Sequence, residues 1–292
     1  MSGIGHQWTG AFGEVIDLTP DGPSSLRLTN DPPVEGLSWP EELEWVRTHT
    51  TRHGQRYLGG RIPARDAFFA VIAGTGPTDW LAARTRFVRS LRPGHVGTWR
   101  VTNQADGSYR ELRARFTPGP ALFAKDPSAS GRELIRVPLV ADDPWWRGPL
   151  ITREFGQAET DVDFFADADS ESPTAVLQLM SSFTAATAAI SNPGDVPAWM
   201  VAHVRGPVDG FSVGVGSSVV AGAVEIPENR TLTVNFGERV VLWDDGTPVP
   251  YAALTAADFA AVPPGETVPL SVQMAGTGTV LVELSPCYFE AF

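Results

Sequence analysis

Short alternating segments, separated by turn residues, restrict this chain to a mainly antiparallel β fold. Its 29 glycines and 25 prolines are spread along all 292 residues rather than clustered. Alternation of apolar and polar residues is typical of half-buried strands. Examples are the segments 44–48, 67–72 and 97–102. Asp106-Gly107 lies between two such runs and predicts a hairpin, because glycine accepts the positive φ of a tight turn.

One segment departs from this pattern and predicts a single helix over residues 79–92. Thr78 is a suitable N-cap, Asp79 suits the positive end of the helix dipole, and Pro93-Gly94 ends the segment. At 100° per residue the apolar residues share one arc of the helix. They are Trp80, Leu81, Phe87, Val88 and Leu91.

Four arginines of this helix are candidate binding residues. Arg86, Arg89 and Arg92 fall on the polar face, whereas Arg84 falls inside the apolar arc. Two interpretations of Arg84 remain open. Its aliphatic stem packs while its head reaches solvent, or its guanidinium forms an ion pair with a neighbouring domain or subunit.

The charge of the chain changes near residue 150. Residues 1–150 hold 18 Lys and Arg against 16 Asp and Glu, whereas residues 151–292 hold 4 against 18. We therefore expect two domains, 1–150 and 151–292, with a boundary between about 147 and 160. The adjacent Trp145 and Trp146 between prolines are candidates for a plug at this domain junction.

An acidic stretch follows the expected boundary, at 159–171, and predicts a solvated linker that proteases can cut. At the other end of the chain, Tyr288, Phe289 and Phe292 are too apolar to be left in solvent. We therefore expect the last few residues to return to the first domain.

The second half predicts about seven short strands, which favours a sandwich or jelly roll. The run 176–190 is ambiguous, since its alanines favour helix, but its threonines and the following turn favour a strand. The expected strands are 201–204, 211–215, 223–226, 231–234, 240–243, 268–272 and 280–284.

Cellular context is constrained by what the sequence lacks. Cys287 is the one cysteine, so no intrachain disulfide is expected, and the N-terminus shows no secretory pattern. No apolar run is long enough to span a membrane. We expect a soluble protein from a reducing compartment, or one that never needs oxidation, without membrane partners. The acidic second half argues against nucleic-acid binding there.

Several patterns resemble catalytic or metal sites, but none predicts one. Ser212 lies in a G-x-S-x-G pattern that continues as strand, whereas a nucleophile elbow needs a helix next. His49 and His53 in a strand lie about 13 Å apart, too far for one metal ion. The residues therefore predict a protein that is not an enzyme, with no cofactor and no metal site.

Several motifs, in their order and spacing, resemble the distal tail proteins of phages, often called minor tail proteins in phages of actinobacteria. In the first half they are Leu91-Arg92-Pro93, Gly97-Thr98-Trp99-Arg100-Val101 and the run from Leu139 to Trp146. In the second half they are the run from Asn192 to Trp199, His203-Val204-Arg205-Gly206-Pro207, the run from Phe259 to Gly265, and Pro286-Cys287-Tyr288.

The resemblance implies a structural virion protein at the distal end of the tail, assembled in the host cytoplasm. Its first domain, a β-barrel or sandwich with one α-helix, would form a homo-hexameric ring. Its second domain would be a galectin-like β-sandwich that points outward and holds fibres, accessory proteins or sometimes carbohydrate. The implied partners are the tail tube protein, tail tip or baseplate hub proteins, and tape measure or fibre proteins.

If the chain forms the ring that the resemblance implies, the four arginines of the predicted helix become candidate interface residues. They are Arg84, Arg86, Arg89 and Arg92. A closed ring joins one patch to a different patch on the next copy. We expect a carboxylate from the neighbouring copy to pair with Arg84, since that guanidinium lies among apolar residues.

Two other functions compete with this one. The first alternative is a carbohydrate-binding jelly roll that adheres to the host cell surface, for which Trp199 or Trp243 would have to be exposed. The second is a wall hydrolase, which needs two carboxylates in one cleft. Asp142 and Asp143 point to opposite sides of an extended chain and do not fit it.

Overall fold

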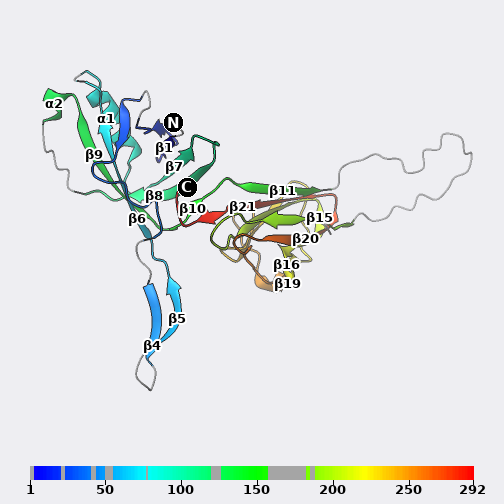
Figure 1. Ribbon diagram of the computed structural model, residues 1–292. Helices are drawn as coiled ribbons and strands as arrows, with labels where there is room; N and C mark the ends of the chain where they lie inside the picture. Colours follow the sequence, from blue (N-terminus) through cyan, green and yellow to red (C-terminus); the bar gives the residue numbers. More distant parts are fainter. Residues whose placement is uncertain are drawn as a thin grey trace, which may run out of the picture. The chain divides into compact units, whose positions relative to one another are not determined.

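The chain folds into two compact β units, shown in the computed structural model of Figure 1. Unit 1 comprises Met1–Pro149 and Cys287–Phe292, and unit 2 comprises Leu150–Pro286. The structure describes residues 3–20, 24–40, 44–49, 55–76, 78–119, 126–156, 182–184 and 188–292. The predicted acidic linker 159–171 lies outside these residues. The prediction of a mainly β chain with one long helix is confirmed.

Unit 1 is built on a sheet that almost closes into a barrel. Its strands run in the order β2-β1-β7-β8-β9-β6-β3, and all neighbours are antiparallel. They are β1 (Ile4–Thr9), β2 (Val15–Asp17), β3 (Leu26–Thr29), β6 (Arg65–Ala73), β7 (Val96–Asn103), β8 (Tyr109–Phe116) and β9 (Glu133–Ala141). The two edges meet where the Leu28 N–H donates to the Leu18 carbonyl, at 2.8 Å.

Large aromatic residues fill unit 1. The interior contains Trp8 of β1, Phe69 of β6 and Trp99 of β7, and all three side chains are almost completely buried. Trp99 contacts Phe69 at 5.0 Å and Trp146 at 5.4 Å between ring centroids. Burying rings of this size stabilises the unit by about 2–3 kcal/mol each. The predicted hairpin at Asp106-Gly107 joins β7 to β8, and Gly107 has φ +74.

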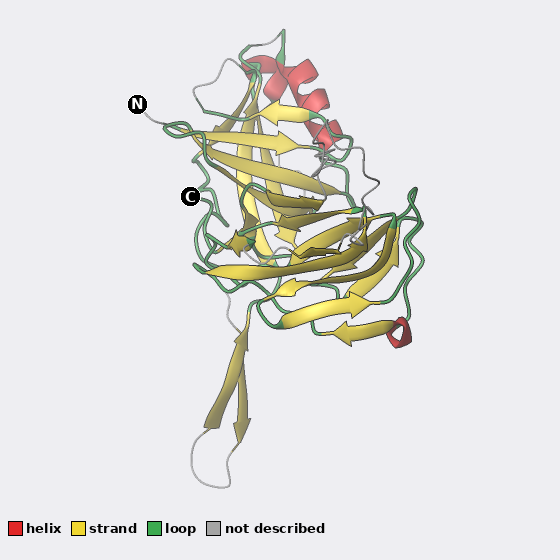
Figure 2. Cartoon of the chain, turned by 90° about the vertical axis from the view of Figure 1, so that its right-hand side faces the viewer, coloured by secondary structure: helices red, strands yellow, loops and turns green. Residues whose placement is uncertain are grey.

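Two helices and a separate hairpin complete the N-terminal part of unit 1. The helices are α1 (Trp80–Ser90) and the four-residue α2 (Pro127–Ser130). The hairpin pairs β4 (Glu44–His49) with β5 (Gln55–Arg61) as a two-stranded sheet of its own. Figure 2 shows this hairpin extending away from the barrel.

The C-terminal residues of the chain belong to unit 1. Strand β22 (Cys287–Tyr288) pairs with β10 (Trp146–Arg147), and β10 also pairs with β8. The Ala291 N–H donates to the Leu37 carbonyl at 2.8 Å, and the Ala291 side chain is buried. Phe292 is 56% exposed, contrary to the expectation that it needs burial, whereas its neighbour Ala291 belongs to the core of unit 1.

Unit 2 consists of two sheets that share one core. The first sheet, in the order β11-β21-β14-β17-β18, comprises β11 (Ile151–Gly156), β21 (Thr279–Leu284), β14 (Met200–Arg205), β17 (Thr231–Asn235) and β18 (Val240–Trp243). The second, in the order β12-β20-β15-β16-β19, comprises β12 (Ser182–Thr184), β20 (Thr267–Gly276), β15 (Val208–Val215), β16 (Ser218–Gly222) and β19 (Leu254–Ala257), and β13 (Ala189–Ser191) also pairs with β20.

Buried residues alternate along the strands of both sheets, which is the pattern of a sandwich. In β14 they are Met200, Ala202 and Val204, and they belong to the same core as Val213 and Val272 of the other sheet. The described parts of the ambiguous run 176–190 include two short strands, β12 and β13.

The strand predicted at 223–226 is wrong. Strand β16 ends at Gly222, after a register shift at Ala221, and only Ile226 makes an isolated bridge, to Val208. The shift ends the regular ladder, so the apolar residues that follow do not continue it.

Candidate assembly surfaces

The buried side of helix α1 is narrower than the apolar arc predicted from its sequence. Ala83 and Phe87 are buried at helical spacing with Ser90, whose hydroxyl donates to the Phe87 carbonyl at 2.7 Å. The apolar arc predicted from the sequence includes Leu81 and Val88, but they are 58% and 41% exposed. A small and a polar residue in the contact stripe bring the helix close to the barrel, so its apolar flanks stay outside.

The predicted N-cap of this helix is also corrected. Asp79, not Thr78, is the N-cap residue, and its side chain does not cap the helix. The carboxylate instead accepts hydrogen bonds from the N–H groups of Thr75 and Gly76 and from the Thr75 hydroxyl. These bonds lower the pKa of Asp79, with the Thr75 hydroxyl as the largest cause.

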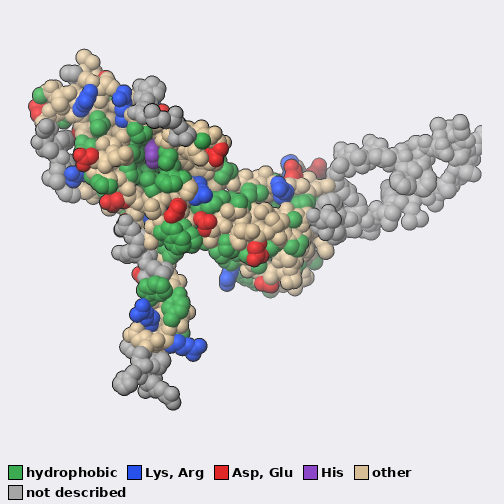
Figure 3. Space-filling model, in the orientation of Figure 1, with side chains coloured by type: hydrophobic (Ala, Val, Ile, Leu, Met, Phe, Trp, Pro, Cys, Tyr) green, Lys and Arg blue, Asp and Glu red, His purple; other side chains and the backbone are tan. Residues whose placement is uncertain are grey.

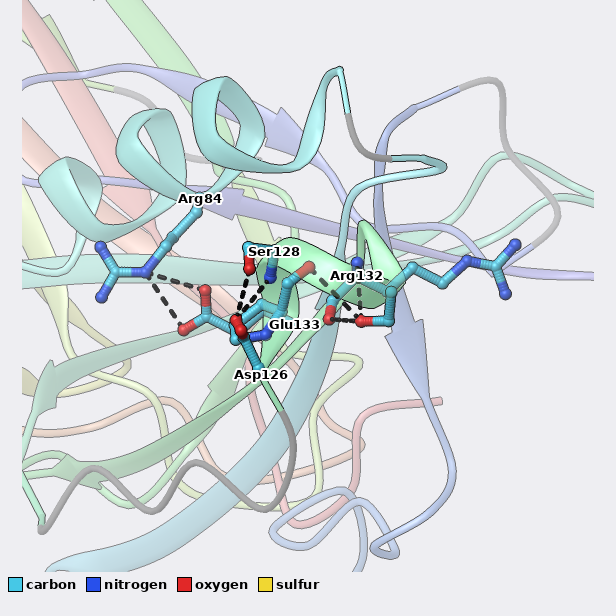
Figure 4. A network of polar contacts seen from close by, with 7 residues as sticks. Arg84, Asp126, Ser128, Arg132 and Glu133 are labelled. Carbon is cyan, nitrogen blue, oxygen red and sulfur yellow. Dashed lines mark hydrogen bonds and ion pairs between the residues drawn. The ribbon is translucent and has the colours of Figure 1, made fainter.

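Arg84 pairs within its own chain, which corrects the expectation that a neighbouring copy supplies the carboxylate. Its Nε lies 2.8 Å from one carboxylate oxygen of Glu133 and 3.1 Å from the other. Glu133 begins β9 and is 9% exposed, whereas the Arg84 side chain is 34% exposed. Figure 4 shows the two terminal nitrogens of Arg84 pointing away from Glu133. The pairing stabilises the contact of α1 with the barrel and leaves those nitrogens for other acceptors.

Arg86 and Arg89 of α1 lie on the solvent side, as expected, and so does Arg92, which follows the end of the helix by two residues. Arg86 pairs with Glu14 beside β2, at 2.6 Å between Nε and the carboxylate. Arg92 lies over the ring of Phe12, 5.5 Å from its centroid, and Phe12 is 69% exposed. Arg89 lines a shallow hollow of about 530 Å³ on the outer side of α1. Exposed pairs of this kind contribute little to stability.

These residues form a mixed apolar and basic surface, which we call the helix face. It consists of Phe12, Val15, Leu81, Val88, Arg86, Arg89 and Arg92. Each of its four apolar members is more than 40% exposed. Apolar residues grouped on a surface and rimmed by charge are typical of protein interaction sites. The sequence indicated the arginines of this surface, but not its apolar members.

The hairpin β4–β5 is a second exposed surface. Trp45, Val46, Tyr57 and Leu58 are 48–57% exposed, and they divide between its two faces. On one face Trp45 and Tyr57 meet edge to face at 5.5 Å between centroids, with Arg47 beside Trp45. Green apolar and blue basic side chains cover the hairpin in Figure 3. A two-stranded hairpin without a packed face is marginally stable in water.

The predicted junction residues Trp145 and Trp146 have different surroundings within unit 1. Trp146 is completely buried, and its indole N–H donates to the Gly36 carbonyl at 3.0 Å. Trp145 is half-buried and meets Phe289 edge to face at 5.5 Å. Their role at the domain junction stays a prediction.

This region is held together by the hydrogen bonds of a buried arginine, which the sequence pattern did not indicate. Arg65 is 3% exposed, and burial lowers its pKa to about 10, so it remains charged at neutral pH. Its guanidinium donates to four main-chain oxygens, those of Pro144, Gly36, Ser38 and Phe289, at 2.6–2.9 Å. It follows β5 by four residues, so it anchors the base of the hairpin to the C-terminal residues of the chain.

The residues considered for catalysis lie in ordinary structural positions. Ser212 lies inside the continuous strand β15, as predicted. Asp142 binds Arg115 and Asp143 binds Arg147, so the two carboxylates are engaged separately. His53 lies outside the described residues, as does the side chain of His49.

Metal-ligand clusters and membrane-spanning helices are both absent from the described ranges. No cluster of three or more His, Cys, Asp or Glu residues that could hold a metal ion is found there. No described helix has the length and apolarity to cross a membrane. Cys287 is half-buried, and burial raises the pKa of its thiol to about 11.

The fold is shared with hub proteins of phage tails. No protein-family model matches the chain, and no curated protein matches it. Among solved structures, the Dit protein of phage SPP1 is similar over 97% of this chain and 98% of that chain, with a TM-score of 0.55 and 12% identity. Its structure is described as a paradigm of the hub adsorption apparatus in phages that infect Gram-positive bacteria. The chain has the fold of a phage distal tail protein.

A chain of the phage P2 baseplate, in its activated conformation with Ca, is also similar. It has a TM-score of 0.50 and 8% identity, again over 97% of this chain and 98% of that chain. The distal-tail fold therefore extends over nearly the whole length of this chain, and the resemblance inferred from the sequence motifs is confirmed at the level of the fold.

The aromatic residues considered for carbohydrate binding differ in exposure. Trp199 is 41% exposed, beside Gly237 in the turn after β17. Trp243 in β18 is partly covered by the guanidinium of Arg230, 5.0 Å from the ring centroid. Arg230 is held in turn by Asp244 and Asp245, so only Trp199 of the two offers a large free surface.

Proposed function

We propose that this chain is a structural component of the distal tail, a hub between the tail tube and the tip or baseplate. The observation that carries the proposal is a distal-tail fold covering 97% of this chain and 98% of the SPP1 hub protein. A match that covers both units is stronger support for a shared architecture than a match to one β-sandwich, which is a common fold. We propose that the protein acts by assembly, without catalysis.

We further propose that unit 1 forms a closed ring of six copies. A ring of identical copies needs two different patches on each copy, one for each neighbour. The helix face and the hairpin are each suited to one side of such a contact, because both expose apolar side chains, and each would meet a different surface of the adjoining copy. A neighbour that packed on the hairpin would supply the buried face that it lacks, and a stable interface of this kind buries roughly 800 Å² per partner.

Both surfaces are basic, so they do not pair with each other. The described part of the hairpin carries Arg47, Arg56 and Arg61 against Glu44. The helix face carries three arginines, of which Arg86 is already paired. We therefore propose that each meets a neutral or acidic surface of the adjoining copy, since opposed like charges raise the free energy of association.

Unit 2 has a different part in this proposal. Residues 151–292 hold 18 acidic and 4 basic residues, so adjacent copies of this half repel each other. We propose that unit 2 serves as the galectin-like module of the hub and holds fibre or accessory proteins. The tail tube, tip and tape measure proteins would bind the ring, and the site of action would be the tail end of the virion.

Surface variants test the ring without unfolding the chain. Trp45→Asp with Leu58→Asp on the hairpin, or Leu81→Asp on the helix face, puts charge into the proposed interfaces. Mass photometry of each purified variant should show single chains where the unchanged protein shows the ring. Leu134→Asp on β9 is the matched control, because Leu134 is 43% exposed and lies outside both surfaces.

The outcome that would contradict this proposal is equally specific. Rings that form unchanged in both the hairpin and the helix-face variants would show that these surfaces do not carry assembly. Loss of rings in the Leu134→Asp control alone would move the interface to β9.

A further inference from the structure

The C-terminal segment, residues 287–292, contacts the chain just before the hairpin β4–β5. The Ala291 N–H donates to the Leu37 carbonyl at 2.8 Å, and the Ala291 side chain lies in the core of unit 1. Nearby, the rings of Trp39 and Phe289 stack face to face, 4.1 Å apart between centroids and within 10° of parallel. Residues 36–40, which we call the entry segment of the hairpin, are thus held by residues from the other end of the sequence.

Arg65 links the same two segments a second time. It follows β5 by four residues, so it lies where the chain leaves the hairpin. Its guanidinium donates to the Ser38 carbonyl and to the Phe289 carbonyl, each at 2.7 Å. Arg65 is 3% exposed, so water does not compete for these bonds. The entry segment, the exit of the hairpin and the C-terminal segment therefore meet at one buried guanidinium.

The base of the hairpin is not closed by the strands of the hairpin itself. The pairing of β4 with β5 begins only at Glu44 and Arg61, and the two strands form a separate sheet. Before them lies a hollow of about 70 Å³, lined by the entry segment and by residues 63–66, with Pro40 and Pro63 among the lining residues. Proline has no N–H with which to bond across such a space. The direction of the hairpin therefore depends on the contacts of its base with the rest of unit 1.

We propose that the C-terminal segment controls ring assembly, because it fixes the hairpin in the direction that a neighbouring copy recognises. The inference rests on the ring under the proposed function and names its regulation. A surface that is held in its bound geometry loses less conformational entropy on association. When the base is released, only the fraction of hairpins in the competent direction can bind, and the apparent affinity falls by that fraction.

The place of this segment in the sequence gives the control a consequence. Residues 287–292 follow the whole of unit 2, Leu150–Pro286. A chain is synthesised from its N-terminus, so unit 1 receives the segment only after unit 2 has been made. The exposed apolar side chains of the hairpin, such as Trp45 and Leu58, then become competent for assembly only in chains that carry both units. Premature association of unit 1 alone is disfavoured in this way.

Single-molecule energy transfer between two dyes measures the direction of the hairpin. The full-length chain carries Cys287→Ser, and the dyes are attached at Gln55→Cys on β5 and Arg113→Cys on β8, both exposed positions. Picomolar concentrations keep the chains single, so the measurement does not depend on ring formation. This labelled chain, the parent, should show one narrow population of transfer efficiency.

Phe289→Ala in the parent should broaden or shift this population, because the stack on Trp39 is lost while the Phe289 carbonyl remains for Arg65. Without labels, the same variant should raise the dissociation constant of the ring at least about tenfold by mass photometry. Phe292→Ala is the matched control, since Phe292 belongs to the same segment but is 56% exposed, and it should behave like the unchanged protein in both measurements.

Trp39→Ala removes the stack from the other side. Trp39 is 61% exposed, so this variant keeps the core of unit 1 and remains informative even if Phe289→Ala does not fold. It should reproduce both effects of Phe289→Ala. The double variant should add little to either single variant, because the two rings form one contact.

Three results would overturn the proposal. The first is an unchanged transfer population in Phe289→Ala and Trp39→Ala, and the second is a broadened population with unchanged ring dissociation. The third is loss of rings in Trp39→Ala with an unchanged population, which would place Trp39 in the interface itself. A chain that forms no rings with its C-terminal segment intact refutes the ring and its control together. Rings that form alike with and without the stack refute only the control.

Discussion

The Nη2 atom of Arg65 donates a hydrogen bond to the main-chain oxygen of Phe289 at 2.7 Å, across 224 positions of the sequence. The same guanidinium binds the main-chain oxygens of Gly36, Ser38 and Pro144. The buried guanidinium of Arg65 thus joins three segments of unit 1. They are the segment before the hairpin, at Gly36 and Ser38, the segment at Pro144, and the C-terminal residues at Phe289. Unit 1 is complete only when its final residues have been added.

Replacement of Arg65 should therefore destabilise unit 1 strongly. We expect Arg65→Met to lower its free energy of unfolding by about 3–5 kcal/mol, because four carbonyl oxygens lose a charged donor. Urea unfolding measures this change. Arg113→Met is the control, since Arg113 is exposed on β8, and it should change the free energy by less than about 0.5 kcal/mol. Equal effects of the two variants would contradict the role of Arg65.

A buried histidine predicts a pH dependence of stability. His6 is 8% exposed against Trp99, and burial lowers its pKa from 6.5 to about 4. Between these values the unfolded chain binds a proton that the folded chain does not. Stability should therefore fall as the pH falls from 6.5 to 4, by about 3 kcal/mol from this residue.

Unfolding of His6→Phe over the same pH range checks this prediction. Phenylalanine keeps a ring against Trp99 and removes Nδ1, which is buried without a hydrogen-bond partner. The variant should lose the histidine part of the pH dependence. His95→Gln, at an exposed position, should keep it. If both variants retain the full dependence, His6 is not its cause.

The ion pair between Arg84 and Glu133 should act on the stability of unit 1. We expect Arg84→Ala to lower the free energy of unfolding by about 1–3 kcal/mol, because the nearly buried Glu133 loses its partner. The loss should be smaller when Glu133→Gln is already present. An unchanged free energy of unfolding, together with weaker assembly, would instead indicate that Arg84 acts through a neighbouring copy.

Arg239→Gly should stabilise unit 2, by about 1 kcal/mol, because glycine adopts φ +57 without steric strain. Thermal unfolding measures the gain. Arg205→Gly in the extended strand β14 is the matched control and should be destabilising. A loss of stability in Arg239→Gly would show that the arginine side chain contributes packing that outweighs the backbone strain.

Local patterns predicted much of the fold. Alternation located β6 and β7, and the apolar periodicity with Pro93 located α1 to within two residues. Long-range pairing was not predictable, because nothing near Arg84 in the sequence indicates Glu133, 49 residues away. The sequence also left Arg65 unmarked, since one arginine among many shows its burial only when the barrel has formed.

The candidate surfaces were predicted only in part. Periodicity separated Arg86, Arg89 and Arg92 from the apolar arc, but Leu81 and Val88 share that arc with the buried Phe87, and periodicity does not show that these two are exposed. Hairpin β4–β5 alternates like a half-buried strand pair, although both of its faces are exposed. Apolar residues that a partner would cover show the same sequence pattern as apolar residues that are buried in the core.

Negative-stain electron microscopy of the purified full-length chain tests the central claim most directly. We expect class averages of closed rings with six-fold symmetry, each containing six chains of 31.3 kDa. Particles of single chains at micromolar concentration, or open helical filaments, would contradict the proposal that unit 1 builds a closed hub ring.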